Sequence, residues 1–519
     1  MQGSTRPDPA SVFDRLTLWA SEPATFRMLS VALMVPLLAL YLPGSIWTGN
    51  EENYFQLAYR RVAPDAFSPW SAVFDHSNGR FIGEYLYGGL VKLLGYESAH
   101  LVARVGTAVL YATSLAAMFA SVRLSIIESV AVVLAFHMLG EQILGGEWLF
   151  NGSEPKTIAY ALVFFAVALA NHGRWRAAFV VSAGATWLHF LAGGFWSLAL
   201  GLCAAWQLRS DWRVAARALA IYVVLILPLL AIITHDQMLA TSTLPLPAGD
   251  LSPLDTDQIY AWRNAHHVSP FVNPEIFPRW RRGMVDLGYA IVVLVVVWRR
   301  RTASALLLPL AAIGLAELVL ALIISYLDQE RLALAKLYLF RPSSVTLLIM
   351  LGVAVIAIRS AVTPRVSALA VLSLVVALAV FQAVRLEYRR DRIIPDPPMN
   401  VPHQAELIEA VQSSSDAGEV VVLDPELDPT LRGIRLNRLI GRPTVVAWKF
   451  VPTAPQDIER WYTLMRWREH LFDSGCARGT EGVPVKLLVT ASRLARDRTA
   501  NCGPVIWQRD DMAVVRVGR

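Results

Sequence analysis

Long apolar segments set what this chain can fold into. They fall at about 28–47, 99–120, 124–140, 157–172, 175–190, 192–208, 214–234, 284–299, 303–326, 340–358 and 364–385. Most have the length, roughly 17–25 residues, that carries a helix across a bilayer. Only 17% of the 519 residues are charged and 55% are hydrophobic, which is rare in a soluble protein of this size. The pattern predicts a polytopic α-helical membrane protein with about eleven transmembrane helices.

The connections between these segments differ in charge. One set is short and basic, with Arg123, Arg174, Arg176, Arg209, Arg213, Arg217, Arg299, Arg300, Arg301, Arg359 and Arg365. Arginine in short loops marks the cytoplasmic side, so the amino-terminal segment 1–27 is expected there too. The large connections 48–98 and 235–283 are mixed in charge and are expected at the outer face. The net charge of +6 therefore reflects topology in an inner (plasma) membrane, among membrane lipids, and does not indicate a nucleic-acid partner.

The composition changes after residue 385. Residues 386–400 form a proline-rich linker, and 401–519 are expected to form a small extracytoplasmic (periplasmic or extracellular) α/β domain. Its predicted elements are strands at 419–424 and 485–489, a helix over 455–471 and a closing hairpin over 505–517. Cys476 and Cys502 both lie in it, and outside the cytoplasm a disulfide between them is permitted.

Two adjacent carboxylates, Glu51 and Glu52, follow the first apolar segment directly. Acids where a membrane helix meets water are either a solvated helix exit or a reaction centre, and the pair alone leaves both open. Asp75-His76, later in the same connection, could contribute to the same chemistry or hold a metal ion. The sequence contains no zinc-ligand spacing, nucleotide-binding loop or nucleophile elbow.

Ionisable residues also lie within the apolar segments. Arg104 and Glu317 stand inside them, a costly place that usually marks a functional interior, with a structural ion pair as the alternative. His189 interrupts the stretch 175–206, so two short helices are expected to meet there. Broken helices at membrane depth line cavities or are covered by protein, which favours an outward-facing cavity around this imidazole.

Basic residues and neutral donors gather in the later outer connections. Arg263 precedes His266 and His267, whose imidazoles offer hydrogen-bond donors without full charge, with surface histidines as the alternative. Arg341 opens an apolar segment and either binds a ligand or snorkels to lipid headgroups. With a carboxylate, such residues suit sugar transfer from a lipid-linked phosphate. The carboxylate would deprotonate the acceptor hydroxyl, and the cations would stabilise the departing phosphate.

Several short motifs are shared with a known family. They are Asn50-Glu51-Glu52-Asn53, Glu154-Pro155-Lys156 with Ala159-Tyr160, His189 with Gly193-Gly194, Arg263 with His266-His267, and Phe340-Arg341-Pro342-Ser343. Through these motifs the chain resembles the GT-C superfamily of integral-membrane glycosyltransferases, which use polyprenyl-phosphate-linked sugars. It departs from many members in having two Glu where they have an Asp, which leaves open which of the two is the base.

The resemblance implies a GT-C-like transmembrane domain over 28–385 and a membrane glycosyltransferase. The enzyme would move a sugar from a polyprenyl-phosphate-linked donor to a glycan, lipid or protein acceptor at the outer face. The catalytic candidates are Glu51, Glu52 and Asp75, and the donor-binding candidates are Arg104, Lys156, His189, Arg263, His266, His267 and Arg341. No metal ligand or cofactor is assigned, and the involvement of Mg²⁺ or Mn²⁺ is left open.

Two other functions are compatible with the sequence. The first is a transporter or flippase of a polar lipid or glycolipid, with Arg104, His189 and Glu317 along its path. Duplicated halves, which many transporters show, are not evident here. The second is a non-catalytic scaffold, which would leave these ionisable groups without a role.

Overall fold

The helices of the membrane bundle follow the predicted apolar segments. The computed structural model describes residues 22–363 apart from 42–46, 76, 151, 240–254 and 301–303, and residues 365–518 apart from 367, 378–379, 381–402, 428–432, 477–481, 492–501 and 510–511. The bundle contains α2 (Phe26–Tyr41), α4 (Phe81–Ser121), α5 (Ile126–Met138), α6 (Pro155–Asn171), α7 (Trp175–Leu188), α8 (Phe190–Gln207), α9 (Trp212–Leu239), α12 (Phe277–Arg300), α13 (Leu307–Leu327) and α14 (Ser343–Ala361). The predicted polytopic helical fold is confirmed.

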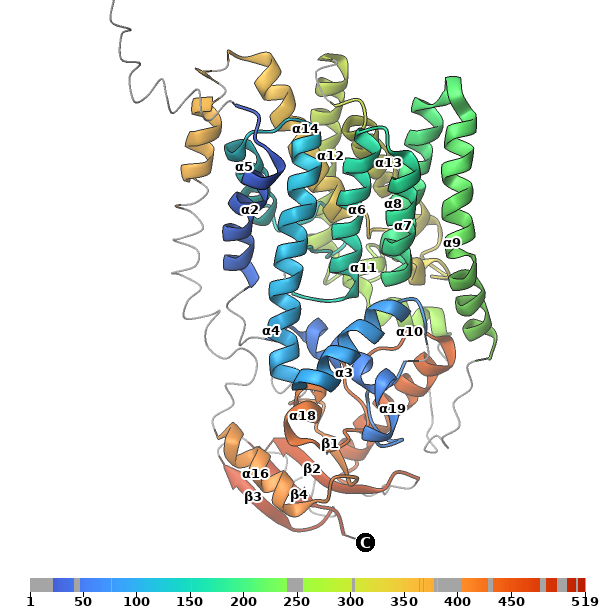
Figure 1. The fold of residues 1–519 in the computed structure, drawn as a ribbon. Coiled ribbons are helices and arrows are strands. Elements are labelled where there is room, and N and C mark those ends of the chain that lie inside the picture. Colours follow the sequence, from blue (N-terminus) through green and yellow to red (C-terminus); the bar gives the residue numbers. More distant parts are fainter. Residues whose placement is uncertain are drawn as a thin grey trace, which may run out of the picture.

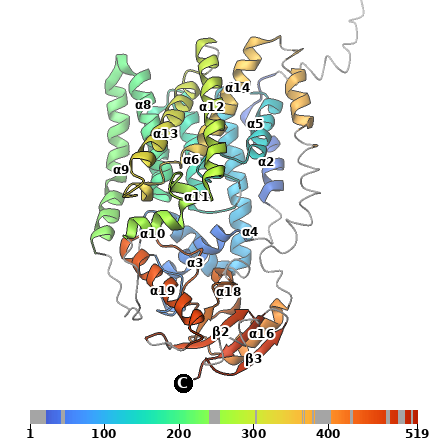
Figure 2. The same cartoon turned by 180° about the vertical axis from the view of Figure 1, so that it is seen from behind.

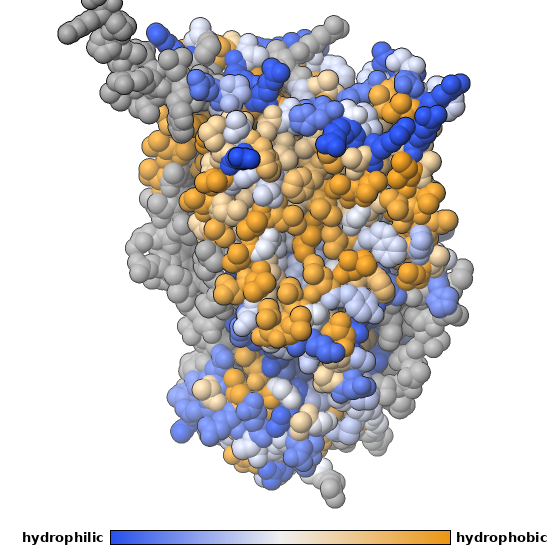
Figure 3. Space-filling view, viewed as in Figure 1, coloured by the Kyte–Doolittle hydropathy of each residue, from blue (hydrophilic) through white to orange (hydrophobic). Residues whose placement is uncertain are grey.

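The bundle presents an apolar surface between two hydrophilic ends (Figure 3). Within the described residues, five helices are long and apolar enough to cross a membrane: α4, α8, α13, α14 and the stretch Arg209–His235 at α9. Four shorter apolar helices accompany them, at Phe26–Ala39, Ile126–Met138, Pro155–Asn171 and Ala368–Ala377. The last of the eleven predicted segments, 364–385, lies only partly within the described residues.

The short basic connections meet at one end of the bundle. Arg359 Nη1 donates to the carbonyl of Arg123 at 2.8 Å, and Asn171 Nδ2 donates to that of Ser121 at 2.7 Å. The other end carries α3 (Gly49–Val62), η1 (Pro64–Ala66), α10 (Thr256–Arg263), α11 (Ala265–Val268) and the carboxy-terminal elements (Figures 1 and 2). The structure thus separates the connections as their charge predicts, and the side of the membrane that each end faces stays a prediction.

Two helix breaks shape the end that carries α3. α4 is bent at Gly95, whose φ of 74° and ψ of 167° are readily adopted only by glycine. The bend separates the first part of α4, residues 81–94, from the longer part that follows. α7 ends and α8 begins at His189, as the sequence predicts, and Nδ1 of His189 accepts a hydrogen bond from the Ala192 amide.

The carboxy-terminal domain is an α/β fold on a four-stranded sheet. The strands are β1 (Val420–Leu423), β2 (Val485–Ala491), β3 (Val505–Arg509) and β4 (Met512–Arg516), in the order β1-β2-β4-β3. β1 and β2 are parallel, whereas β4 runs antiparallel to both neighbours. The helices are α16 (Gln404–Ser414), α18 (Gly433–Ile440) and α19 (Pro455–Asp473). The predicted strands, hairpin and long helix are confirmed, and Cys476 and Cys502 form a disulfide.

The core of this domain continues into the outer connections. Phe74, Ile259 and Tyr260 belong to the same hydrophobic cluster as Val422 and Trp461 of the domain. The described parts of the 48–98 and 235–283 connections that include α3 and α10 therefore lie between bundle and terminal domain (Figure 1).

Candidate active site

A polar cavity of about 700 Å³ lies where the bundle, the outer connections and the terminal domain meet. Its lining residues are Asn50, Asn53, Tyr54, Leu57, Asp75, Arg80, Glu147, Lys156, Tyr260, Arg263, Asn264, His266, His267, Tyr338, Arg341, Lys449, Val451 and Thr453. The cations in that set are Arg80, Lys156, Arg263, Arg341 and Lys449, and the carboxylates are Asp75 and Glu147. The excess of positive charge suits an anionic ligand, and guanidinium and ammonium groups are the usual partners of phosphate.

Glu147 holds two of these cations. Its Oε2 lies 3.1 Å from Lys156 Nζ, and its Oε1 lies 3.8 Å from Arg341 Nη1. All three side chains are buried, and Lys156 also lies 3.1 Å from Glu154 and stacks over the Trp148 ring. Burial alone would raise the pKa of Glu147, but the charges of Lys156 and Arg341 lower it to about 2. The carboxylate is therefore ionised at neutral pH and keeps both cations at the cavity wall.

A glycine turn places Glu147. Gly145 and Gly146 have φ values of 88° and 71°, a region that favours glycine. A Cβ on Gly145 would lie 2.4 Å from Phe340 Cβ, and one on Gly146 would lie 2.8 Å from His267 Nδ1. The turn therefore needs glycine for its space as well as for its backbone conformation.

The two histidines of the cavity are neutral at pH 7. Burial and the nearby His266 lower the pKa of His267 to about 3, while burial and the charge of Arg263 lower that of His266 to about 4. His267 Nδ1 donates to the Gly145 carbonyl at 2.8 Å, so in the neutral ring Nε2 is an acceptor. The expectation that the two imidazoles offer uncharged donors to a ligand stays a prediction, and for His267 the Nδ1–H is already used by the Gly145 carbonyl.

Asp75 lies in a second cluster of the cavity. Its Oδ2 accepts from Arg80 Nη2 at 2.7 Å and from Thr453 Oγ1 at 3.1 Å, and its Oδ1 accepts from the Ser77 amide at 3.0 Å. Thr453 belongs to the terminal domain, so this contact joins the first outer connection to that domain. His76, the other half of the predicted Asp-His pair, lies outside the described residues.

Glu51 does not line the cavity. Its carboxylate is wholly buried and accepts from Arg104 Nε at 2.8 Å, Arg104 Nη2 at 2.7 Å and the Ser153 amide at 2.8 Å. The ion pair that the sequence left open as the alternative for Arg104 is therefore present. His189 is likewise buried as the cap of α8 and is absent from the lining, and so is the half-buried Glu317 of α13.

Glu52, buried next to Glu51, faces a different partner. It accepts from Arg438 Nε at 2.7 Å and from Arg438 Nη2 at 2.9 Å, and it too is absent from the cavity lining. The catalytic role of Glu51 and Glu52 stays a prediction. Of the other candidates, the structure brings Asp75, Lys156, Arg263, His266, His267 and Arg341 together around one cavity.

Sequence reasoning missed part of the lining, although one signal was present. Asn50, Asn53 and Tyr54 stand at helical spacing i, i+3 and i+4 in α3, so they share a face that excludes the two intervening glutamates. Helical periodicity applied to this motif would have identified the amides. No local signal marks Lys449, which reaches the cavity from the terminal domain.

The described donor groups of the cavity do not form a typical divalent-metal site, and the involvement of a metal stays open. Among the described residues, no group of three or more His, Cys, Asp or Glu side chains is placed to hold an ion. Both cavity carboxylates are paired with cations, Asp75 with Arg80 and Glu147 with Lys156. Mg²⁺ and Mn²⁺ prefer several oxygen ligands, and this arrangement does not offer them.

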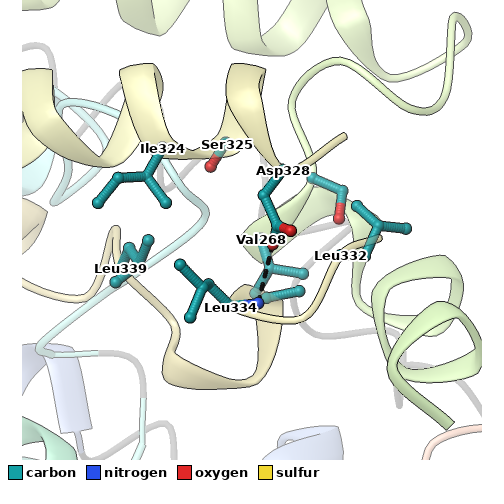
Figure 4. A pocket seen from close by; sticks show the side chains of 9 residues that line it. Val268, Ile324, Ser325, Asp328, Leu332, Leu334 and Leu339 are labelled. Carbon is teal, nitrogen blue, oxygen red and sulfur yellow. Dashed lines mark hydrogen bonds between the residues drawn. The ribbon is translucent and has the colours of Figure 1, made fainter. Parts of the chain in front are cut away.

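A smaller hollow lies behind the segment that carries Tyr338. Val268, Ile324, Leu332, Leu334 and Leu339 are among its lining residues, and Asp328 accepts a hydrogen bond from the Leu334 amide at 2.8 Å (Figure 4). The backbone on either side of this hollow is thus held by packing and by a turn, which keeps the neighbouring cavity wall in place.

Comparisons with known proteins give one similarity. No protein-family model and no curated protein matches the chain. Among solved structures, the chain is similar to the crystal structure of ArnT from Cupriavidus metallidurans in the apo state, with a TM-score of 0.40 and 11% identity over 93% of this chain and 97% of that chain. Values this low say nothing about activity, which has to be inferred from the residues of the cavity.

Proposed function

We propose that the chain is a membrane glycosyltransferase. It moves a sugar from a polyprenyl-phosphate-linked donor to an acceptor hydroxyl at the outer face of the membrane. The observation that carries the proposal is the cation-rich cavity at the end of an apolar bundle, lined by the carboxylates of Asp75 and Glu147. The sequence motifs that resemble the GT-C superfamily support it, since several of them meet at this cavity.

Lys156 and Arg341 bind the donor phosphate in this proposal. Both are buried beside Glu147, and the Nε atom of Arg341 is buried without a hydrogen-bond partner among the residues that the structure describes. An unsatisfied guanidinium N–H is costly, and a phosphate oxygen would satisfy it. As the bond between the anomeric carbon and the phosphate oxygen breaks, negative charge grows on the phosphate, and fixed cations stabilise that charge.

Asp75 is the proposed general base. We infer an inverting transfer, in which the acceptor hydroxyl approaches the anomeric carbon from the side opposite the departing phosphate, so the base belongs to a different part of the cavity from Lys156 and Arg341. Asp75 meets this requirement because its partners are Arg80 and Thr453. It takes the hydroxyl proton while the new carbon–oxygen bond forms and the lipid phosphate leaves.

The transporter alternative is not favoured by the contacts. It relies on Arg104 and His189 to line a path, but Arg104 is occupied by Glu51 and His189 caps α8. Neither lines the cavity.

The decisive experiment uses the purified chain in liposomes with a polyprenyl phosphate carrying a radiolabelled sugar. An extract of the native membrane supplies acceptors, and both the labelled product and the side of the bilayer that holds the labelled lipid are measured. The proposal predicts label on the acceptor and free polyprenyl phosphate. Movement of the intact labelled lipid across the bilayer without bond cleavage would contradict it and favour a flippase.

A further inference from the structure

The adjacent carboxylates of the acidic motif hold α3 to two different bodies. Glu51 faces Arg104 of the membrane helix α4, whereas Glu52 faces α18 of the terminal domain. On α3 itself, Asn53 and Tyr54 line the cavity. The helix therefore joins the bundle, the cavity and the terminal domain.

We propose that Glu52 is a positioning residue: by binding Arg438 and Arg435 it sets the terminal domain on α3 so that Lys449 and Thr453 complete the cavity. The inference rests on the proposed function only for the chemistry that the completed cavity performs. The placement of the domain stands on the contacts themselves.

The α3–α18 contact consists of Glu52 and Gln56 with Arg435, Asn437 and Arg438. Arg438 binds both oxygens of Glu52 at 2.7 and 2.9 Å, and Arg435 Nε lies 3.4 Å from Oε1. One turn along α3, the Gln56 side-chain oxygen accepts from Asn437 Nδ2 at 2.8 Å. Glu52, Gln56, Arg435 and Asn437 are buried, and the Glu52–Arg438 pair is bidentate, so the contact fixes both the distance and the rotation between the two helices.

Arg438 has further partners that keep it in this place. Its Nη1 lies 2.5 Å from Glu97 Oε1, and its guanidinium stacks over the Trp47 ring with the central carbon 4.4 Å from the ring centre. Without Glu52, the exposed Glu97 would be the remaining carboxylate partner of the Arg438 guanidinium. The loss of Glu52 therefore frees the Arg438 guanidinium to change its orientation, while its attraction to Glu97 remains.

A neighbouring apolar contact also holds the terminal domain to the first outer connection. Leu57, Ala72 and Val73 pack against Ala447 and Phe450 of the terminal domain. Apolar burial is non-directional and tolerates sliding, whereas a buried, bidentate ion pair specifies one register. We infer that the buried Glu52–Arg438 pair specifies the relative position of α3 and α18.

The position of α18 is transmitted to the cavity wall along the chain. Asn437 Oδ1 accepts from the Thr444 amide at 3.2 Å, and the Thr444 carbonyl accepts from the Ala72 amide at 2.6 Å. Four residues later, the carbonyl of Trp448 accepts from Arg263 Nε at 2.7 Å. Lys449 follows directly and lines the cavity, so its place depends on the contact made by α18.

The test uses the full chain with Glu52→Gln, Arg438→Gln and the double variant. Amide hydrogen exchange of α18 reports docking, and the liposome assay reports transfer. Both single variants should speed amide exchange in α18 and lower the transfer rate by similar factors. The double variant should show the same exchange and transfer rates as the single variants, because all three remove the same Glu52–Arg438 interaction. The pH profile of transfer should keep its shape, since no proton-transferring group has changed.

The matched control is Glu419→Gln, which removes the carboxylate of an exposed pair with Lys486 in the same domain. It should leave exchange in α18 and transfer unchanged. Lys449→Met gives a second arm that spares the α3–α18 contact. It should leave exchange unchanged and raise KM about 10- to 100-fold, the value of one charge-assisted hydrogen bond.

Three outcomes would overturn the inference. One is unchanged α18 exchange in Glu52→Gln and Arg438→Gln. Another is a large loss of transfer in Glu52→Gln with full transfer in Arg438→Gln, which would make Glu52 the base. The third is an unchanged KM in Lys449→Met. If the native chain performs no transfer, faster exchange in both single variants still supports the docking role, and only the proposed function fails.

Discussion

Glu51→Gln should destabilise the protein by about 3–5 kcal/mol, the usual cost of removing one partner of a buried ion pair. The carboxylate is wholly buried and accepts two hydrogen bonds from Arg104, one from the Ser153 amide and one from the Thr48 amide. Glutamine keeps the size of the side chain, but its NH₂ group must face a donor. Arg104 would remain as a buried cation without its counter-charge.

The lowered pKa of Glu51 corresponds to a contribution of similar size. Burial alone would raise its pKa, but Arg104 and His100 lower it from 4.5 to about 2. A shift of that size corresponds to about 3 kcal/mol. Because the folded pKa lies below the unfolded one, this stabilisation is complete above about pH 4.5 and is lost as the pH falls towards 2.

Thermal unfolding in detergent measures both effects. At pH 7 the midpoint of Glu51→Gln should lie several degrees below that of the native chain, and the gap should narrow as the pH falls from 4.5 towards 2. Transfer per folded molecule should stay near the native value because Glu51 does not line the cavity. An unchanged midpoint with a hundredfold loss of transfer would refute this reasoning and restore Glu51 as a base.

Three further outcomes are expected. Arg341→Ala should raise the KM for the lipid-linked donor about 10- to 100-fold, measured by initial rates, because a charge-assisted phosphate contact is lost; an unchanged KM would remove this residue from the donor site. Cys476→Ser should destabilise the terminal domain by about 3 kcal/mol, because its disulfide spans 26 residues of sequence. Equal denaturant midpoints for the native chain and Cys476→Ser would contradict this. Reporter fusions after Arg301 and at Arg519 should report opposite sides of the membrane, and equal signals would overturn the outward placement of the terminal domain.

The architecture was predictable because its signals are local. Apolar length and arginine placement suffice to locate membrane helices, and His189 marked the break between α7 and α8. Alternating and apolar runs located β1, β2 and the β3–β4 hairpin. α18 was missed because its eight residues are fewer than the window over which helical periodicity can be recognised, and its role comes from Arg435 and Arg438 meeting Glu52.

The site was only partly predictable because pairing is non-local. Arg104 is 53 residues from Glu51, and Arg438 is 386 residues from Glu52. Nothing near the two glutamates indicates that both are occupied by arginines. Lys156 and Arg341 were found because each opens an apolar helix, where a cation lies at the rim of a bundle. Their common partner Glu147 could be recognised only once the glycine turn had placed it between them.

The central claim, that chemistry takes place in the cavity bordered by Asp75, is tested most directly by Asp75→Asn. Asparagine preserves the size of the side chain and an oxygen acceptor for Thr453, but it cannot take up the proton of the acceptor hydroxyl. Single-turnover transfer in liposomes, with donor affinity and the folded amount measured in parallel, should fall by about 10²–10⁴ while donor affinity changes little. Transfer at the native rate by Asp75→Asn would contradict the account.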